Sequence, residues 1–175
     1  MNKEKLRQLH KELRKNQKEN NIFLKIISLP IYKEAKSIAI YYSTEEEVDT
    51  IKLIEYSLQD NKKVYLPRVI GKRQMVFYQI TDLNPNNFTK SKFGIFEPIE
   101  STTTSKIDLT IVPGICFDKK KYRIGYGGGF YDTYLKNNKT YKIGICFDCN
   151  LIDTIPINKY DIPMDMVITE KNTIS

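Results

Sequence analysis

The sequence predicts a single α/β domain with a largely parallel or mixed central sheet flanked by helices. Segments rich in strand-forming residues alternate with segments of helical hydrophobic period, the order that is typical of layered α/β folds. The most continuous apolar run, 108–117 (DLTIVPGICF), has the character of a central strand buried on both faces. No internal repeat and no low-complexity linker divides the 175 residues. We therefore expect one domain spanning 1–175.

The first predicted element is an amphipathic helix over residues 2–18. Leu6, Leu9 and Leu13 recur there at helical spacing. The same segment contains the one strongly basic run of the chain, with glutamates interleaved, a pattern that is typical of a solvated helix face. The basic residues are Lys3, Lys5, Arg7, Lys11, Arg14, Lys15 and Lys18.

The remaining elements alternate between strands and helices. The pair Asn20-Asn21 interrupts the first helix, and a second, more buried helix is expected before Pro30. Runs of β-branched and aromatic residues predict the strands, and helical periods predict the helices. In order, the prediction is a helix over 22–29, a strand over 37–42, a helix over 49–60, strands over 63–69, 75–80 and 108–117, a helix over 131–136, and strands over 142–147 and 165–169.

Composition restricts the ligands and the compartment. The net charge of +7 suits anionic ligands such as nucleotides, polyglutamate-tailed molecules or nucleic acid, without choosing among them. No stretch approaches the roughly eighteen apolar residues that span a bilayer, and the charged N-terminus lacks the apolar core of a signal peptide. Three cysteines, with Cys146-x-x-Cys149 as a weak redox or metal motif, favour a reducing compartment. We expect a cytoplasmic protein with no membrane partner.

The segment 123–132 (RIGYGGGFYD) is the strongest candidate for a functional site. It contains four of the eight glycines of the chain. It follows the predicted central strand, and ligands of open α/β sheets lie beyond the carboxyl ends of the strands. Glycine permits positive φ and lets main-chain N–H groups approach an anion, while the next helix would point its N-terminus into the same space.

Charged residues at both ends of this segment fit an anion site. Arg123 and the preceding Lys119-Lys120-Lys121 add positive charge, and Asp132 is suited to hold a magnesium ion. The segment is neither a Walker A loop nor a dinucleotide fingerprint. On its residues alone, it is either a phosphate-binding loop or a flexible glycine turn.

Other polar groups are weaker candidates. Glu45-Glu46-Glu47 and Asp49 follow a predicted strand and fit either a ligand site or the acidic start of a helix. His10 is the one histidine and lies on a polar helix, so no histidine-based triad or zinc site is expected. Asp161 and Asp165 have the spacing of turn residues more than that of ligands.

The ordered combination of these segments resembles the 5-formyltetrahydrofolate cyclo-ligase family, also called 5,10-methenyltetrahydrofolate synthetases. A strand followed by PGICFD and then RIGYGGGFYD is its most specific part. The resemblance covers nearly the whole chain. The other matching segments are Lys3-x-x-x-Arg7, 43–50 (STEEEVDT), Leu66-Pro67-Arg68, 94–98 (GIFEP) and 155–170 (IPINKYDIPMDMVITE).

The resemblance implies contacts for ATP, a folate and Mg²⁺, and it gives Arg123 and Asp132 catalytic roles. The implied ATP contacts are Lys3, Glu4, Lys5, Leu6, Arg7, Arg123, Ile124, Gly125, Tyr126, Gly127, Gly128, Gly129, Phe130 and Tyr131. The implied folate contacts are Thr44, Asp49, Tyr126, Gly127, Gly128, Gly129 and Phe130. The implied magnesium ligands are Asp132 and Asp161.

Some positions depart from the family pattern. Gly128 stands where some members carry a basic side chain, and Phe130 replaces a common tyrosine. Thr44 stands where a larger apolar residue can occur.

The resemblance also implies a reaction, the ATP- and Mg²⁺-dependent conversion of 5-formyltetrahydrofolate to 5,10-methenyltetrahydrofolate with release of ADP and phosphate. The γ-phosphate passes to the formyl oxygen, the neighbouring folate nitrogen closes the ring, and phosphate departs. This chemistry needs positioning and charge neutralisation rather than a protein nucleophile. We expect a monomer whose partner is the folate, with or without a polyglutamate tail.

Two other classes of protein fit part of the sequence. A nucleic-acid-binding protein fits the charge and the twelve tyrosines, but no RNA- or DNA-binding motif is present, and we expect no nucleic-acid partner. A sugar-phosphate or coenzyme A enzyme fits the fold, but it needs a catalytic glutamate or lysine pair that the sequence does not single out. On its residues alone the basic N-terminal helix is a solvated face, whereas the resemblance predicts that it closes over the nucleotide.

Overall fold

A mixed, largely parallel sheet of seven strands forms the centre of the protein in a computed structural model that describes residues 1–18 and 21–175. In spatial order the strands are β12 (Thr173–Ile174), β11 (Met166–Ile168), β9 (Tyr141–Ile145), β6 (Leu109–Val112), β1 (Ser37–Ile40), β2 (Lys63–Gly71) and β3 (Gln74–Ile80). The strands from β11 to β2 are parallel to their neighbours, and the edge strands β12 and β3 are antiparallel. The predicted α/β class with one domain is confirmed.

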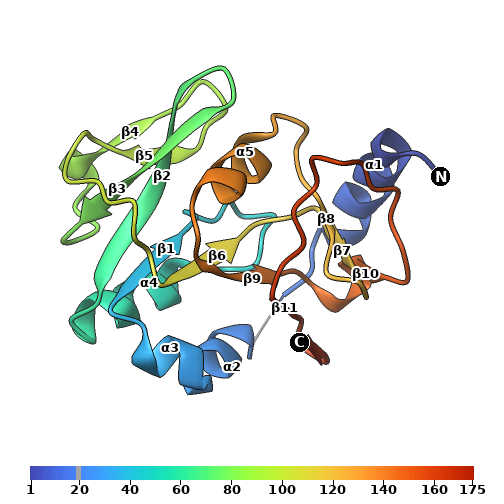
Figure 1. Ribbon diagram of the computed structural model, residues 1–175, viewed down its shortest axis with the longest axis horizontal. Helices are drawn as coiled ribbons and strands as arrows, with labels where there is room; N and C mark the ends of the chain where they lie inside the picture. The colour runs from blue at the N-terminus through green and yellow to red at the C-terminus, as the bar shows by residue number, and fades with distance from the viewer. Residues whose placement is uncertain (19–20) are drawn as a thin grey trace.

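Helices cover both faces of this sheet (Figure 1). Alternate residues of each strand point to opposite faces, so each face receives its own set of apolar side chains. Below the sheet in Figure 1 lie α2 (Ile22–Ser28), α3 (Pro30–Glu34) and α4 (Ile51–Gln59), whereas α5 (Phe130–Asn137) lies above it and α1 (Lys3–Arg14) lies to one side.

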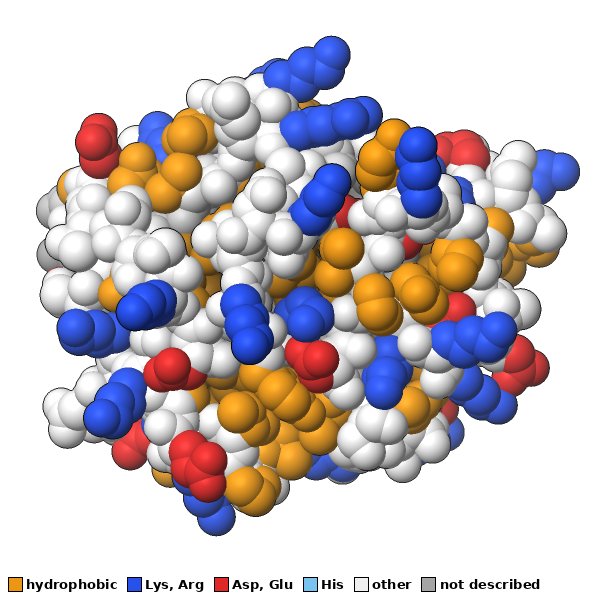
Figure 2. Space-filling model, viewed as in Figure 1, with side chains coloured by type: hydrophobic (Ala, Val, Ile, Leu, Met, Phe, Trp, Pro, Cys, Tyr) orange, Lys and Arg blue, Asp and Glu red, His pale blue; other side chains and the backbone are white. Residues whose placement is uncertain are grey.

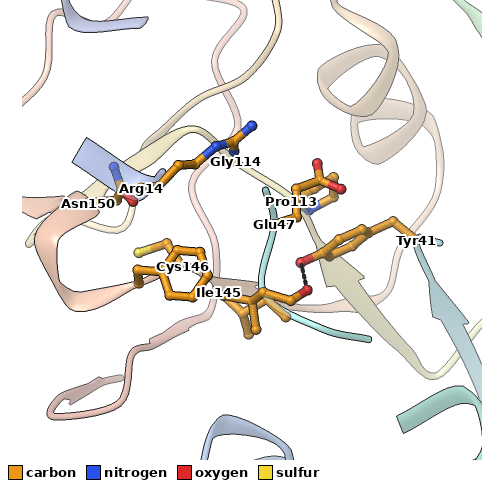
Figure 3. Close-up of a pocket in the computed structure, with 10 residues that line it drawn as sticks. Arg14, Tyr41, Glu47, Pro113, Gly114, Ile145, Cys146 and Asn150 are labelled. Atoms are coloured by element: carbon orange, nitrogen blue, oxygen red, sulfur yellow. Dashed lines mark hydrogen bonds between the residues drawn. The ribbon is translucent and has the colours of Figure 1, made fainter. Parts of the chain in front are cut away.

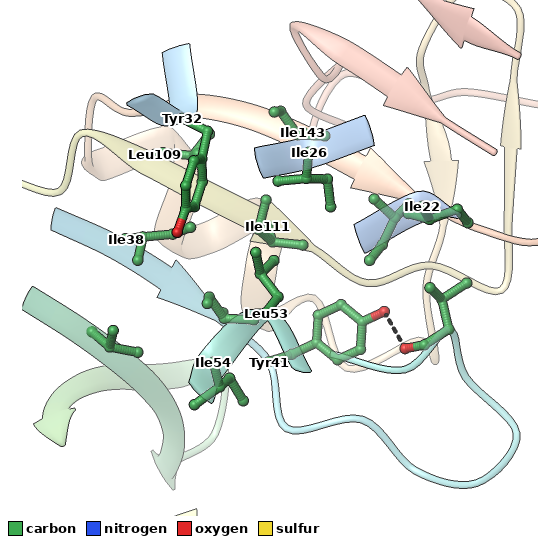
Figure 4. Packing of buried hydrophobic residues seen from close by; sticks show 14 of the residues in the cluster. Ile22, Ile26, Tyr32, Ile38, Tyr41, Leu53, Ile54, Leu109, Ile111 and Ile143 are labelled. Atoms are coloured by element: carbon green, nitrogen blue, oxygen red, sulfur yellow. Dashed lines mark hydrogen bonds between the residues drawn. The ribbon is translucent and has the colours of Figure 1, made fainter. Parts of the chain in front are cut away.

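The larger core lies between the sheet and α2, α3 and α4 (Figure 4). Ile38 and Ile40 of β1 belong to it, together with Ile26 of α2 and Leu53 of α4. Ala39, between the two isoleucines, belongs to a separate cluster on the α5 side. The sheet is therefore buried on both faces at its centre, as the apolar runs predict.

Smaller elements surround the central sheet. They are a three-stranded sheet in the order β10 (Leu151–Ile152), β7 (Cys116–Asp118) and β8 (Arg123–Ile124), a hairpin of β4 (Phe88–Lys90) and β5 (Phe96–Pro98), and the 3₁₀ turns η1 (Pro85–Asn87) and η2 (Asp148–Asn150). Helix α1 packs against the small sheet and η2. None of the hairpin, the small sheet or α3 is predicted from the sequence.

The prediction of one long strand over 108–117 is wrong in its second half. Its first half, β6, is the central strand, between β9 and β1. Pro113 has no N–H to donate to a sheet, and the chain turns at Gly114, where a Cβ atom would lie 2.5 Å from the ring of Phe117. The second half therefore leaves the central sheet and forms β7 of the small one.

The first helix is shorter than predicted, and of its three stripe leucines only Leu6 is buried. It ends at Arg14 rather than near residue 18, and Leu9 and Leu13 are each 42% exposed. The buried residues are Leu6, His10 and Arg14. The reason is that Leu6 packs on apolar residues of the small sheet, whereas His10 and Arg14 have hydrogen-bond partners further along the helix, so apolar contact and hydrogen bonding together select the face.

The break between the first two helices is only partly within the described residues. Asn20 lies outside them, and Asn21 immediately precedes α2. After Leu29 the chain starts α3 with Pro30 at its first position, where the missing N–H costs nothing. The other predicted helices and strands are present, with ends shifted by a few residues.

The topology creates a crevice at the carboxyl ends of β1 and β6. From β1 the chain passes through α4 to β2 on one side, and from β6 it passes through α5 to β9 on the other. Such a reversal of direction between neighbouring parallel strands is where open α/β sheets bind ligands.

Candidate functional site

Residues that follow the parallel strands line a small pocket in this crevice (Figure 3). Tyr41 follows β1, Gly114 lies just after β6, and Cys146 follows β9. Arg14 enters from the α1 side, and Glu47 lies on the opposite side. The cavity measures about 10 Å³, which holds about one water molecule. The crevice is thus closed by side chains.

The glycine loop has the backbone conformation that its composition predicts. Gly127 and Gly129 have φ angles of +101° and +70°, which other residues rarely adopt. Gly129 immediately precedes α5, and the first N–H groups of a helix have no partner within it. The loop therefore presents free main-chain donors at a helix N-terminus, the arrangement that favours an anion.

The N-terminal helix brings cations to this loop. Arg7 donates from Nε to the carbonyl oxygen of Gly125 at 2.9 Å, and its guanidinium lies 3.7 Å from where a Cβ atom on Gly127 would be. Lys3 Nζ lies 2.8 and 2.6 Å from the two carboxylate oxygens of Asp161. The two segments predicted to bind ATP, far apart in sequence, are therefore adjacent in space.

The other N-terminal candidates have different surroundings. Glu4 and Lys5 are exposed, and Glu4 pairs with Arg7 at 3.0 Å. Leu6 is buried in a cluster with Ile124 of β8. Leu6 and Ile124 therefore seat α1 on the small sheet.

The two predicted magnesium ligands converge on one segment. Asp132 accepts a hydrogen bond from Ile162 N at 3.3 Å, and Asp161 is the residue before Ile162. Asp132 also pairs with Arg123 at 3.2 Å, as Asp161 does with Lys3. Both carboxylates thus have a cationic partner that also suits a phosphate.

These carboxylates fit a magnesium ion that shares its coordination with phosphate. No cluster of three or more potential metal-ligating side chains occurs within 1–18 and 21–175. Magnesium is commonly held by one or two carboxylates, with phosphate oxygens and water as the other ligands. Asp132 and Asp161 meet that lesser requirement.

Two buried polar atoms beside the loop lack a hydrogen-bond partner among the described residues. They are Nε of Arg123 and the hydroxyl of Tyr131. The Arg123 guanidinium lies 5.5 Å from the Tyr131 ring centre, and burial raises the pKa of Tyr131 and keeps it protonated. Buried polar atoms are nearly always satisfied, so a ligand or an ordered water is expected at this place.

Tyr126 joins the loop to the segment that follows β1. Its hydroxyl accepts a hydrogen bond from Arg14 at 2.8 Å and donates one to Glu47 at 2.7 Å. Burial of the hydroxyl and the charge of Glu47 raise the pKa of Tyr126, so the hydroxyl stays a donor at neutral pH.

The predicted folate residues fall into two groups. Thr44 and Asp49 are exposed in the segment after β1, where Thr44 N donates to Glu47 at 2.9 Å and Asp49 accepts from Ile51 N at 2.8 Å. Asp49, just before the N-cap residue Thr50, therefore gives the first N–H group of α4 an acceptor. Phe130 begins α5, and its ring fills the space that a side chain on Gly128 would need, since a Cβ there would lie 2.5 Å away.

Arg14 and a groove near α5 are site features that sequence reasoning missed. Arg14 follows Lys3 and Arg7 at the spacing of one helix face, a signal that the leucine stripe obscured. The groove measures about 360 Å³ and lies between α5 and the β2–β3 hairpin. Arg73 lines it and also lies 3.8 Å from where a Cβ atom on Gly129 would be. Such contacts between distant segments leave no local signal.

Several weaker candidates have structural surroundings. Asp165 accepts from Lys142 N at 2.8 Å and so ties the segment before β11 to β9. The three cysteines are free, and burial raises the thiol pKa values of all three, that of Cys116 to about 12. Neither a nucleophile nor a metal pair is indicated at Cys146 and Cys149.

The fold and the site define an α/β protein with a glycine loop suited to an anion and a group of cations at the carboxyl end of a largely parallel sheet. No described helix is long and apolar enough to cross a membrane. The family model of the 5-formyltetrahydrofolate cyclo-ligase family matches residues 2–170.

Relatives and a solved structure agree with this match. A 5-formyltetrahydrofolate cyclo-ligase of Haemophilus influenzae is 31% identical, over 94% of this chain and 97% of its own length. That of Escherichia coli K12 is 31% identical, over 83% of this chain and 84% of its own length. The NMR structure of Aquifex aeolicus 5,10-methenyltetrahydrofolate synthetase has a TM-score of 0.86 at 32% identity, covering 99% of this chain and 92% of the other. The chain belongs to the 5-formyltetrahydrofolate cyclo-ligase family, and it is accordingly a ligase of folate one-carbon metabolism.

Proposed function

We propose that this enzyme uses ATP and Mg²⁺ to convert 5-formyltetrahydrofolate to 5,10-methenyltetrahydrofolate, with release of ADP and phosphate. The observation that carries the proposal is the junction of the glycine loop with Arg7, Lys3 and the two aspartates, in a chain of this family. The loop and the cations suit a polyphosphate, the two carboxylates suit the magnesium ion that accompanies it, and the family name specifies a folate.

The phosphates of ATP are held between α1 and the glycine loop. Main-chain donors at the start of α5 point to the same space as Arg7, which already contacts Gly125 and lies beside Gly127. Lys3 and Arg123 exchange their aspartate partners for phosphate oxygens when the nucleotide binds. This exchange gives the buried, unpartnered Nε of Arg123 an acceptor.

Asp132 and Asp161 are the residues that would hold the magnesium ion. When bound, the ion neutralises charge on the transferring phosphoryl group. Releasing Lys3 and Arg123 from the two carboxylates frees oxygen ligands for the metal and cations for the phosphate at the same time.

The folate lies on the other side of the loop, against the segment after β1. Thr44 and Asp49 are exposed there, and Tyr126, Gly127, Gly128, Gly129 and Phe130 border it from the loop. Tyr42 packs its ring 5.9 Å from Phe88 and 5.4 Å from Phe96, so aromatic faces suited to a flat heterocycle lie next to this segment.

Positioning and charge are what these residues contribute to the chemistry. The formyl oxygen attacks the γ-phosphorus, and the bond to the β-phosphate oxygen breaks to give ADP. The neighbouring folate nitrogen then attacks the formyl carbon and loses its proton, and the carbon–oxygen bond breaks to release phosphate. Arg123 and the loop N–H groups stabilise charge on the phosphoryl group, and no protein nucleophile is needed.

The remaining expectations concern the state of the enzyme. We propose a cytoplasmic monomer that binds no nucleic acid and no membrane. On the face shown in Figure 2, Lys and Arg side chains are scattered among acidic and apolar ones, which supports a small anionic ligand over a nucleic-acid track.

The direct test mixes the purified protein with 5-formyltetrahydrofolate, ATP and Mg²⁺ and records the absorbance of 5,10-methenyltetrahydrofolate. Product is expected to form with all three present and to stop when ATP is omitted or Mg²⁺ is chelated. Product formation without ATP, or none in the complete mixture, would refute the proposal.

A further inference from the structure

Arg14 is a buried cation of the site to which neither the sequence nor the proposed chemistry gives a role. Its side chain is 4% exposed and lines the pocket at the carboxyl ends of the strands. It donates to the Tyr126 hydroxyl at 2.8 Å and lies 3.6 Å from Glu46. Its buried Nε has no hydrogen-bond partner among the described residues, so the contacts of its Nη2 atom with Tyr126 and Glu46 are the ones that offset the cost of burying the charge.

The Tyr126 hydroxyl also bonds to a second segment, the one that follows β1. The Tyr126 residue as a whole is 53% exposed, but its hydroxyl lies between Arg14 and Glu47. One carboxylate oxygen of Glu47 accepts from Tyr126 at 2.7 Å, and the other accepts from Thr44 N at 2.9 Å. Arg14, Tyr126, Glu47 and the backbone at Thr44 thus form one continuous series of hydrogen bonds.

This series connects three separate parts of the chain. Arg14 belongs to α1, which carries the predicted ATP cations, and Tyr126 belongs to the glycine loop. Glu47 and Thr44 belong to the segment predicted to contact the folate. Bonds to charged groups are stronger than neutral ones, and bonds in series polarise one another. The Tyr126 hydroxyl is therefore where this series joins α1 to the segment after β1, beside the direct contact of Arg14 with Glu46.

We propose that Arg14 and Glu47 are positioning residues that act through the Tyr126 hydroxyl and hold the nucleotide and folate segments in one mutual geometry. This inference rests on the proposed function, because it assigns one ligand to each segment. It implies that binding of one substrate favours binding of the other, since a ligand that restrains one segment also restrains the other through this series of hydrogen bonds.

Tyr126→Phe is the decisive variant, because it removes one hydroxyl from a half-exposed ring and leaves the ring in place. Lys11→Met is its matched control: Lys11 lies 5.4 Å over the same ring but is exposed and is not part of the series. Binding of a non-hydrolysable ATP analogue is measured by calorimetry with and without 5-formyltetrahydrofolate.

In the parent protein and in Lys11→Met, the folate is expected to tighten binding of the analogue roughly tenfold, the effect of one hydrogen bond to a charged group. In Tyr126→Phe this factor is expected to fall to near one. Arg14→Lys keeps a donor at this place, so it should retain part of the tightening factor. Tyr126→Phe combined with Glu47→Gln should reduce the factor no further than either change alone. Equal tightening in the parent and in Tyr126→Phe, or none in the parent, would overturn the inference.

Amide hydrogen exchange tests this series of hydrogen bonds without any ligand. Tyr126→Phe should increase exchange in both 43–50 and 123–131, whereas Lys11→Met should increase it in neither. If the parent binds neither ligand, the proposed function fails, but this measurement still shows whether the series of hydrogen bonds connects the two segments. Unchanged exchange in one of the two segments would refute it.

Discussion

His10 shows how one buried side chain seats α1 beside the site. It is 3% exposed, and Asn150, also buried, donates to its carbonyl oxygen at 2.9 Å and lies 3.1 Å from its ring Nδ1. The Asn150 nitrogen is a donor, so the ring nitrogen must be an unprotonated acceptor. Burial lowers the pKa of His10, opposed in part by a hydrogen bond to the backbone of Cys149. The histidine expected to lie on a polar helix is thus a neutral docking residue.

A pH dependence of stability follows from this environment. Below the ordinary histidine pKa of about 6.5, the unfolded chain binds a proton that the folded protein resists. The stability that His10 contributes is therefore present above that pH and is lost as the pH falls through the lowered pKa of the folded state. We expect the unfolding free energy to fall by up to about 1.4 kcal/mol per pH unit in this window.

Urea unfolding of the parent and of His10→Gln at pH values from neutral to mildly acidic measures this contribution. The variant should be less stable at neutral pH, and the difference between the two proteins should shrink as the pH falls. A difference that stays constant over this range would show that His10 titrates normally in the folded protein.

Asp132 is a paired carboxylate for which the proposed function predicts a catalytic role. Its carboxylate holds Arg123 and Ile162 N, and it is one of the two proposed magnesium ligands. We expect Asp132→Asn to lower turnover by roughly 100-fold or more, because an amide binds Mg²⁺ poorly and leaves Arg123 without a charged partner.

The control is Asp153→Asn, at a carboxylate that is 85% exposed and pairs with Lys119. Initial rates against Mg²⁺ concentration should be unchanged in this variant and should require more Mg²⁺ in Asp132→Asn. Full turnover of Asp132→Asn at ordinary Mg²⁺ would remove this residue from the proposed site.

Among the elements, α1 is a helix that the local sequence pattern predicts, but its buried face is one that the pattern does not predict. The leucine spacing predicts the helix but selects the wrong face, because Leu9 and Leu13 face solvent while His10 and Arg14 are buried. Hydrophobic period reports burial only where the surface that receives a helix is apolar. Here that surface offers Asn150, Tyr126 and Glu46 as polar partners, which lie far along the chain.

Leucine substitutions in α1 test this assignment. Leu6 is 7% exposed and packs with Cys116, Ile124 and Ile155, so Leu6→Ala should cost about 2–4 kcal/mol of unfolding free energy. Leu13→Ala should change it by no more than about 0.5 kcal/mol. Both variants replace leucine with alanine, so denaturant unfolding compares the same chemical change at two positions of α1. Equal losses of unfolding free energy would contradict the docking of α1 through Leu6.

The segment 108–117 contains a strand that the sequence predicts and a strand end that it does not. Its apolar content correctly predicts the central strand, β6, but a continuous apolar run does not show where a chain leaves a sheet. That point depends on Pro113 and on Gly114, whose missing side chain leaves room for the ring of Phe117. The glycine loop was more predictable, because positive φ at Gly127 and Gly129 is a local property of glycine.

At the scale of the whole molecule, strand order gives the site its location. β1 and β6 are adjacent, and the chain leaves them in opposite directions, so the segments after them meet in one crevice. The glycine loop and α1 close that crevice from the side, which brings residue 3 into contact with residue 161, and residue 126 into contact with residue 47. Sequence motifs and the family resemblance named most of these residues, but only the fold shows that Arg14 and Glu47 connect them.

The central claim is that ATP bound at the glycine loop phosphorylates the formyl oxygen of the folate. The most direct measurement uses 5-formyltetrahydrofolate labelled with oxygen-18 in the formyl group and follows the label by mass spectrometry of the released phosphate. The account predicts that the phosphate carries the label, in proportion to the methenyl product and the ADP formed. Unlabelled phosphate, with the label released in water, would contradict it.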